Sequence, residues 1–149
     1  MHVNNIVEKV DSSFYALKTL RAHGLDGQAL WDVTRATVVA QLLYASPAWW
    51  GFLKADDKSK LQSLLTKAQR YGYLPYKFDT LDTLCESFDQ TLFHSTMYNT
   101  KHVLHQLLPP PKETGYNLRH RSHNLTIPSG VTTTMKQNFI NRKLFDDIY

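Results

Sequence analysis

The stretch "HVNNIVEKVDSSFYALKTLRAHG", residues 2–24, decides the fold of this chain. Its apolar residues recur at steps of three and four, so they draw one stripe along a helix. The stripe consists of Val3, Ile6, Val7, Val10, Phe14, Leu17 and Leu20. Gly24 follows, where a left-handed C-terminal cap would stand. The stretch therefore predicts an amphipathic helix over residues 3–23 whose apolar side packs against other elements.

A second helix is predicted after this one. Asp26 is placed to cap it, and Pro47 is expected to break it. Its apolar positions are Leu30, Val33, Val38 and Leu42. The later part, "VVAQLLYASPAWWGFL" (residues 38–53), is apolar on nearly every side, which indicates a buried helix end. Trp49, Trp50 and Phe52 are expected to pack in the core, and the alternative for the two tryptophans is a platform for base stacking.

A third helix is predicted over residues 56–72, and it has two distinct sides. Its inner face is formed by Leu61, Leu64, Leu65 and Ala68. A separate polar side carries Lys60, Ser63, Lys67 and Arg70 at steps of three and four. This side is either the solvated face of an amphipathic helix or a ridge that contacts phosphates.

The last third of the chain contains a Pro-rich spacer. A loop over residues 71–80 leads to a helix that starts at Leu81, capped by Asp79 or Thr80, and continues toward Leu107. Pro109 to Pro111 cannot continue a helix, so they mark an extended spacer. A turn-rich segment and a short terminal helix are predicted beyond it. The apolar positions of that helix are Phe139, Ile140, Leu144, Phe145 and Ile148, with a strand across Phe139 and Ile140 as the alternative.

The positive charge lies in the last third of the sequence. Residues 1–100 carry ten Lys and Arg against ten Asp and Glu, whereas residues 101–149 carry seven against three. A localised basic excess suggests a polyanionic partner, and a solvated tail is the plain alternative. With 149 residues, one cysteine and no long apolar run, the chain is expected to be a single intracellular unit, nuclear or cytoplasmic, that is neither secreted nor inserted in a membrane.

No complete catalytic motif is present in the sequence. It has no Gly-rich phosphate loop, nucleophile elbow or dinucleotide fingerprint. The pair Asp56-Asp57 stands where a helix begins, which the helix dipole favours without any metal, and Asp146-Asp147 stands at the end of a terminal element. The spacing of Cys85 and the histidines matches no zinc motif, and Cys85 falls within an apolar stripe. We therefore expect no cofactor, no small-molecule substrate and no catalysis by this chain alone.

Six segments in order resemble the end of a reverse transcriptase of LINE-type (non-LTR) retrotransposons, jockey-like in character. They are "HVNNIVEKVDSSFYALKTLRAHGL", "VVAQLLYASPAWWGFL", "LTKAQRYGYL", "LCESFDQTLFHSTMYNTKHVLHQLLPP", "YNLRHRSHNLTIP" and "NFINRKLFDDIY". The resemblance covers essentially the whole chain. It implies that residues 1–54 are thumb-like helices, residues 55–108 a post-thumb helical region, and residues 109–149 a Pro-rich spacer with a basic tail.

The resemblance also implies what this sequence does not contain. In such polymerases a palm carries the catalytic aspartates in a Y-x-D-D turn, binds magnesium and precedes the thumb. Nothing here matches that turn, since "LKADDK" has Lys54 in place of the tyrosine and follows the thumb-like helices. The implied partners are RNA or an RNA/DNA hybrid and the missing palm and fingers, which would precede Met1 and carry any magnesium. No polymerase residue is carried over.

Seven residues are candidates for nucleic-acid binding. The basic side of the third helix contributes Lys60, Lys67 and Arg70, because a thumb grips an A-form hybrid through its phosphates. The segment "YNLRHR" contributes Tyr116, Arg119, His120 and Arg121, with the arginines on phosphates and the tyrosine able to stack.

The expected fold is mainly α, a small bundle of three to four helices followed by the Pro-rich spacer and an irregular basic tail with a short terminal helix. The expected function is that of a C-terminal polymerase fragment with residual RNA or DNA binding. The alternative is a helical protein-interaction module that uses the "PAWWGF" surface or the tail.

Overall fold

The computed structural model describes residues 2–113, 115 and 122–146. Within these residues the secondary structure is helical, and the single β feature is an isolated antiparallel bridge between Pro111 and Leu125. The mainly α fold predicted from the sequence is confirmed. The chain divides into two compact units, one formed by Met1–Ser46 and Leu53–Cys85 and the other by Pro47–Phe52 and Glu86–Tyr149. The predicted division at residue 54 rests on the family resemblance and that at residue 108 on the Pro-rich spacer, and both stay predictions.

The first unit is built around α1 (His2–Ala22), which confirms the helix predicted over residues 3–23. The Gly24 cap is also confirmed: its φ is +95°, its amide donates to the Arg21 carbonyl at 3.0 Å, and the Leu25 amide donates to the Leu20 carbonyl at 3.1 Å. These two bonds satisfy carbonyls that the helix end leaves unpaired. Helix α1 therefore stops where the sequence indicates.

The second helix is continuous but not uniform. It comprises α2 (Gly27–Thr34), a π-helical turn η1 (Arg35–Val39) and α3 (Ala40–Leu43). Asp26 occupies the N-cap position in an extended conformation, but its side chain makes no capping hydrogen bond. The helix ends before Pro47, because Ala45 adopts a left-handed conformation with φ of 53°.

Pro47 does not break a helix, contrary to the sequence expectation. It instead lies in the first turn of α4 (Ser46–Trp49), which is followed by the 3-10 turn η2 (Trp50–Phe52). A proline is tolerated in a first turn, where the amide it lacks has no helical partner.

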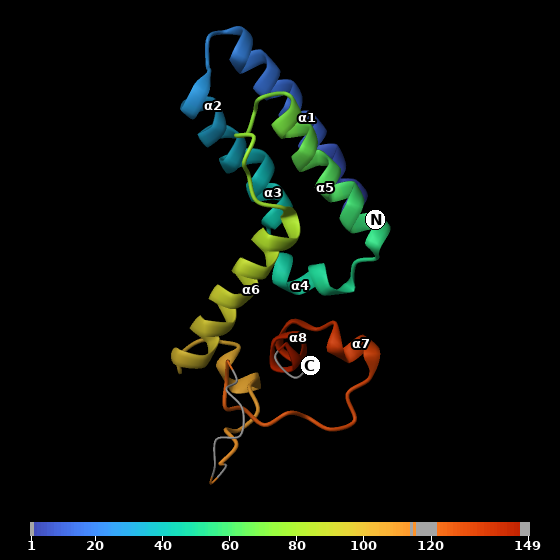
Figure 1. Ribbon diagram of the computed structural model, residues 1–149, viewed down its shortest axis with the longest axis vertical. Coiled ribbons are helices and arrows are strands. Elements are labelled where there is room, and N and C mark those ends of the chain that lie inside the picture. The colour runs from blue at the N-terminus through green and yellow to red at the C-terminus, as the bar shows by residue number, and fades with distance from the viewer. Residues whose placement is uncertain (1, 114, 116–121, 147–149) are drawn as a thin grey trace. The chain divides into compact units, whose positions relative to one another are not determined.

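Helix α5 (Ala55–Arg70) packs beside α1, and the two run in the same direction (Figure 1). Its end repeats the cap of α1: the φ of Gly72 is +77°, and the Tyr73 amide donates to the Ala68 carbonyl at 2.9 Å. The core of this unit draws on all three helical segments and on the loop after α5. Its most deeply buried residues are Val10, Leu17, Val38, Leu42, Leu61, Leu65, Leu74 and Leu81.

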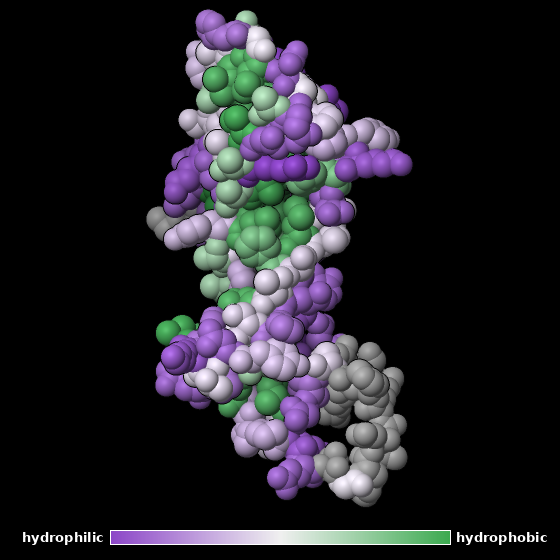
Figure 2. Space-filling view, turned by 90° about the vertical axis from the view of Figure 1, so that its left-hand side faces the viewer, coloured by the Kyte–Doolittle hydropathy of each residue, from purple (hydrophilic) through white to green (hydrophobic). Residues whose placement is uncertain are grey.

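Figure 2 shows the surface of the side that faces left in Figure 1. In the upper part of that view, hydrophobic residues reach the surface between hydrophilic ones.

Helix α6 (Leu81–Tyr98) begins in the first unit and continues in the second. Of the two residues predicted to cap it, Thr80 does so, since its hydroxyl accepts from the Thr83 amide at 3.3 Å. The helix stops at Tyr98, earlier than the apolar pattern suggested. Asn99 turns the chain, with its side chain accepting from the Lys101 amide at 3.0 Å, and a short 3-10 turn η3 (His105–Leu107) follows.

The segment after the prolines folds back in the second unit. It forms α7 (Thr133–Lys136), which the sequence analysis did not predict, and α8 (Phe139–Phe145), the predicted terminal helix. One cluster of buried hydrophobic residues in this unit draws on both sides of the spacer: Phe93, Leu125, Phe139 and Leu144. The prolines therefore connect two parts of one apolar cluster.

An ion pair and two histidines reinforce this cluster. Arg142 pairs with the buried Asp89 and donates to the Gln137 carbonyl at 3.1 Å, and a side chain at Gly51 would collide with both Arg142 and that carbonyl. The ring of His123 bridges the Leu125 amide, at 3.2 Å, and the Leu144 carbonyl, at 3.1 Å. His105 bonds the Thr96 carbonyl at 2.8 Å.

Candidate nucleic-acid interface

The C-terminal ends of α1 and α5 are joined by a cationic side chain. Arg21, in the last turn of α1, donates from Nη1 to the Tyr71 carbonyl, just beyond α5. Its guanidinium carbon lies 4.6 Å from the centroid of the Tyr73 ring, which in turn stacks on Phe14 with centroids 5.9 Å apart. Arginine at a helix end is favoured by the dipole and by the unpaired carbonyls there. This contact fixes the two helix ends side by side.

Lys67 makes a second link between the two helices. Its Nζ lies 2.9 Å from Oδ1 of Asp11 and 4.8 Å from the centroid of the Phe14 ring, both in α1. The Lys67 side chain is 43% exposed, so the ammonium group still reaches solvent. An exposed pair of this kind adds little to stability. Its main effect is to hold one cation in the seam between the helices.

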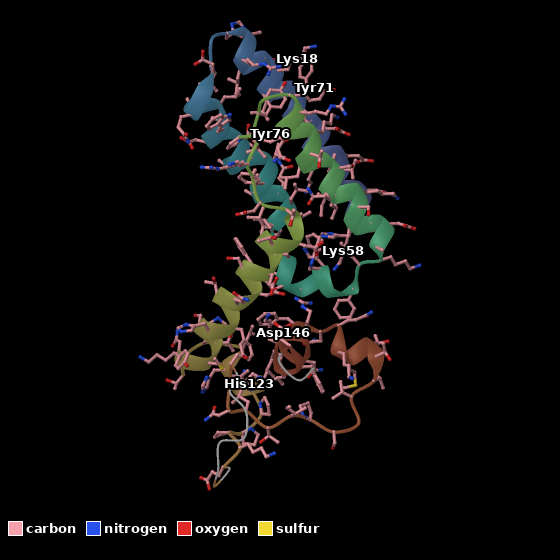
Figure 3. All side chains as sticks on the ribbon, viewed as in Figure 1. Lys18, Lys58, Tyr71, Tyr76, His123 and Asp146 are labelled. Carbon is pink, nitrogen blue, oxygen red and sulfur yellow. The ribbon has the colours of Figure 1, made fainter. Side chains whose placement is uncertain are left out.

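The seam is flanked by exposed residues of both helices. Lys18 of α1 and Arg70 of α5 are exposed, and Tyr15 and Tyr71 are exposed to 76% and 48%. Figure 3 labels Lys18 and Tyr71 at this end of the first unit. We call this surface the α1–α5 face, and its members are Asp11, Tyr15, Lys18, Arg21, Lys67, Arg70 and Tyr71. It carries four cations and one carboxylate, so its local charge is positive.

Two of the seven residues predicted from the sequence, Lys67 and Arg70, belong to this face. Lys60 lies two turns earlier on α5, where its Nζ is 3.9 Å from Oδ1 of Asp57. Lys60 is thus exposed but stands beside carboxylates at the start of its helix. The structure therefore separates Lys60 from the cations that converge at the helix ends.

The other four predicted residues cannot be placed. Tyr116, Arg119, His120 and Arg121 lie outside the described residues. Their assignment to phosphate contact and stacking stays a prediction.

Sequence reasoning missed five members of the face: Asp11, Tyr15, Lys18, Arg21 and Tyr71. The charge pattern of α1 carries one signal that could have found part of the set, since Lys18 and Arg21 are the only cations in its last two turns. The pairing of α1 with α5 has no local signature. Without it, the two basic helix ends cannot be seen to form one surface.

The acidic and histidine candidates form no metal centre in the part of the chain that the structure describes, where no three metal-ligating side chains gather. Asp56 and Asp57 occupy the first turn of α5, as predicted. Cys85 is fully buried, also as predicted. The expectation that Asp146 is a plain solvated end needs refinement, because its carboxylate accepts from the buried Lys143.

The two tryptophans differ in accessibility. Trp50 is only 6% exposed and meets Trp49 edge to face with ring centroids 5.9 Å apart. Since a stacking platform needs open ring faces, the burial of Trp50 favours the packing interpretation over the base-stacking one. The expectation that Phe52 packs in the core is wrong, because this residue is 46% exposed.

Comparisons with protein-family models, with curated proteins and with solved structures find no match for this chain. Within residues 2–113, 115 and 122–146, none of the helices has the length and apolar character needed to cross a membrane.

Proposed function

We propose that this chain is the thumb and post-thumb region of an RNA-directed DNA polymerase of a LINE-type retrotransposon, and that its α1–α5 face binds the phosphate backbone of RNA or of an RNA/DNA hybrid. The polymerase part of the proposal is supported by the ordered sequence resemblance. The binding part rests on one observation, the convergence of Lys18, Arg21, Lys67 and Arg70 at two parallel helix ends.

The arrangement suits a polyanion for electrostatic reasons. Each lysine or arginine that neutralises a phosphate releases a condensed counterion, which favours binding at low salt. Helix ends that point the same way bring the cations together, whereas the acidic residues of α5 stand in its first turn, at the opposite end. The catalytic aspartates and magnesium are assigned to a palm that this sequence does not contain, so we propose no polymerase activity for the chain alone.

The test is the salt dependence of RNA binding by the full chain. Fluorescence anisotropy with a labelled RNA of roughly 20 nucleotides should show affinity falling steeply between about 50 and 200 mM salt. Replacing Lys18 or Arg70 by Ala should lower the slope of log K against log[salt] by roughly one unit each. Neither residue is buried, so these variants should remain folded.

Lys9 provides the matched control. It is an exposed lysine of the same helix as Lys18, but nine residues earlier and therefore about 180° away around the helix axis. Lys9→Ala should leave the slope unchanged. Binding that does not depend on salt, or equal losses from Lys9→Ala and Lys18→Ala, would show that the α1–α5 face is not the phosphate-binding surface.

A further inference from the structure

Phosphate binding leaves two residues of the α1–α5 face without a role. Tyr15 and Tyr71 are 76% and 48% exposed; other described tyrosines are exposed as well, but these two stand beside the cations of the face. Phosphate contact by the cations does not require aromatic rings. The exposed rings of Tyr15 and Tyr71 therefore offer this face a second kind of contact beside the four cations.

The positions of the two rings are fixed by their surroundings. Tyr15 precedes Lys18 by three residues, so the two side chains are neighbours along the surface of α1. Tyr71 is held through its backbone, because its amide donates to the Lys67 carbonyl at 3.1 Å and its carbonyl accepts from Arg21. Its ring centroid lies 6.1 Å from that of Tyr73, and about half of the side chain remains open to solvent.

Exposed aromatic rings interleaved with cations are typical of surfaces that bind single-stranded nucleic acid. Unpaired bases present their flat faces, and each stacked base stabilises the complex irrespective of its identity. In a duplex the same faces are already stacked inside the helix, so a tyrosine on the protein surface gains nothing from them. Tyrosine loses little conformational entropy when it stacks, since it has only two side-chain torsions.

We propose that the α1–α5 face binds single-stranded RNA in preference to duplex, with unpaired bases stacked on Tyr15 and Tyr71 and the adjacent phosphates bound by Lys18, Arg21, Lys67 and Arg70. This inference rests on the proposed nucleic-acid binding and names the form of nucleic acid that the face selects. Because stacking is insensitive to base identity, little sequence preference is expected.

The experiment measures the binding of one labelled RNA of mixed sequence, single-stranded and annealed to its DNA complement, to the 149-residue chain over one series of salt concentrations. The single strand should bind more tightly than the hybrid. Replacing Tyr15 or Tyr71 by Ala should weaken single-strand binding by roughly 5- to 100-fold. Phe at either position should restore most of the affinity, since the stacking ring is retained, and the salt slope should not change in any of these variants.

Tyr76 is the matched control. It is 93% exposed in the same unit, and its carbonyl accepts from Gln69, which lies two residues after Lys67 and so about 200° further around α5. Tyr76→Ala should bind RNA as the unmodified chain does. Circular dichroism of the Tyr71→Ala variant, beside Tyr71→Phe, separates a loss of stacking from a loss of fold.

The outcomes separate the preference for single strands from the phosphate binding on which it rests. Single-strand selection is overturned if the tyrosine variants bind normally and the hybrid binds as tightly as the single strand. Phosphate binding still stands in that case, provided that Lys18→Ala and Arg70→Ala lower the salt slope. If neither form binds in a salt-dependent way, both are overturned. Weakening by Tyr76→Ala equal to that by Tyr15→Ala would also overturn the assignment of stacking to this face.

Discussion

At the scale of single residues, the Asp89–Arg142 pair is the most consequential contact of the second unit. The Asp89 side chain is 6% exposed and that of Arg142 is 23% exposed. The other carboxylate oxygen of Asp89 is buried and has no hydrogen-bond partner among the residues that the structure describes, where Arg142 is the cation that pairs with this charge. Buried charges of this kind are costly to leave unpaired.

We therefore predict that Arg142→Ala lowers the free energy of unfolding by about 3–5 kcal/mol, because it leaves the buried Asp89 carboxylate uncompensated. Asp89→Ala should cost somewhat less, because Arg142 is partly exposed and keeps its bond to the Gln137 carbonyl. The double variant Asp89→Leu with Arg142→Met should lose less than either single variant, since no unpaired charge remains. Urea unfolding followed by circular dichroism measures the three values.

The control for this prediction is the exposed pair of Lys58 and Asp82, whose charged atoms are 3.8 Å apart with side chains 33% and 73% exposed. Asp82→Ala should cost no more than about 1 kcal/mol. A loss for Asp89→Ala as small as that for Asp82→Ala would contradict the importance of the buried pair.

Ala45 carries backbone strain of a different kind. Its φ of 53° lies in the left-handed region, which costs an L-residue with a Cβ roughly 1–2 kcal/mol relative to the right-handed helix. Glycine is free of this cost, although it gains entropy in the unfolded chain. We expect Ala45→Gly to leave the free energy of unfolding unchanged or to raise it by up to about 1 kcal/mol.

Ala16 is the comparison, an exposed alanine within α1 where glycine should cost about 1 kcal/mol. Thermal melting of the two variants side by side gives the answer. Equal losses at positions 45 and 16 would mean that Ala45 is not strained.

At the scale of elements, the π turn between α2 and α3 explains an unusual apolar pattern. The least exposed residues of this helix, Leu30, Thr34, Val38 and Leu42, follow one another at steps of four, and Val39 and Leu43 are buried beside the last two. In a regular α-helix such a row would drift by about 120° around the axis over twelve residues. The π turn takes up one extra residue, as the bond from the Ala40 amide to the Arg35 carbonyl shows, and so brings Leu42 back onto the core side.

Because the π turn takes up one extra residue, we predict that deleting one of its exposed residues is tolerated. Removing Ala36 would leave the same four buried residues at steps of four, three and four, which a regular α-helix keeps on one side. We expect a folded chain with near-normal helical content and a melting temperature within a few degrees of the unmodified one.

The matched deletion is Ser12, also exposed but in the regular helix α1. Its removal rotates Phe14 and Leu17 by about 100° relative to the residues before them and takes them out of the core. Circular dichroism should show a large loss of stability for this variant. Equal behaviour of the two deletions would contradict the one-residue interpretation of the π turn.

The same elements show what the sequence could predict. Helix α1 was located almost to the residue and α5 to within two residues, because an apolar stripe is a local signal and, for α1, the terminal Gly24 is another. The end of α6 and the role of Pro47 were not, since Asn99 and the left-handed Ala45 decide them through local backbone geometry that residue type does not fix. Lys67 and Arg70 of the candidate site follow from helical period, whereas Lys18 and Tyr15 join them only through the tertiary pairing of α1 with α5.

At the scale of the whole molecule, the basic excess of the last third is partly used internally. Arg142 and Lys143 pair with Asp89 and Asp146 inside the second unit, so they contribute little to a surface for a polyanion. Among the described residues beyond 100, the exposed cations are Lys101, Lys112 and Lys136. Among the described residues, part of the basic excess of the tail is therefore paired within the second unit, and the α1–α5 face lies in the part of the chain whose charges balance.

The Pro-rich spacer is not a simple linker between independent parts, because residues on both of its sides pack into one cluster. Phe93 of α6 meets Phe139 of α8 edge to face, with centroids 6.4 Å apart, and His123 at 5.8 Å. Partly buried residues on both sides of the spacer pack against the same cluster: Leu92, Met97, Leu104, Leu108, Ile140 and Phe145. A chain that ends at Leu108 would leave the α6 side of this cluster uncovered, although Leu108 is where the prolines suggest a boundary.

We predict that the chain truncated after Leu108 binds a hydrophobic dye and self-associates, because exposed apolar patches promote association. A chain that ends at Asp146 keeps α7 and α8 and should remain monomeric with a normal melting transition. Size-exclusion chromatography with light scattering, together with dye fluorescence, measures both.

If residues 1–108 prove monomeric, dye-negative and cooperative in unfolding, the tail is a separable appendage. The cluster around Phe93 then adds nothing to the stability of the rest. Aggregation of the shorter chain alone would instead mean that the residues after the spacer complete the core of the second unit.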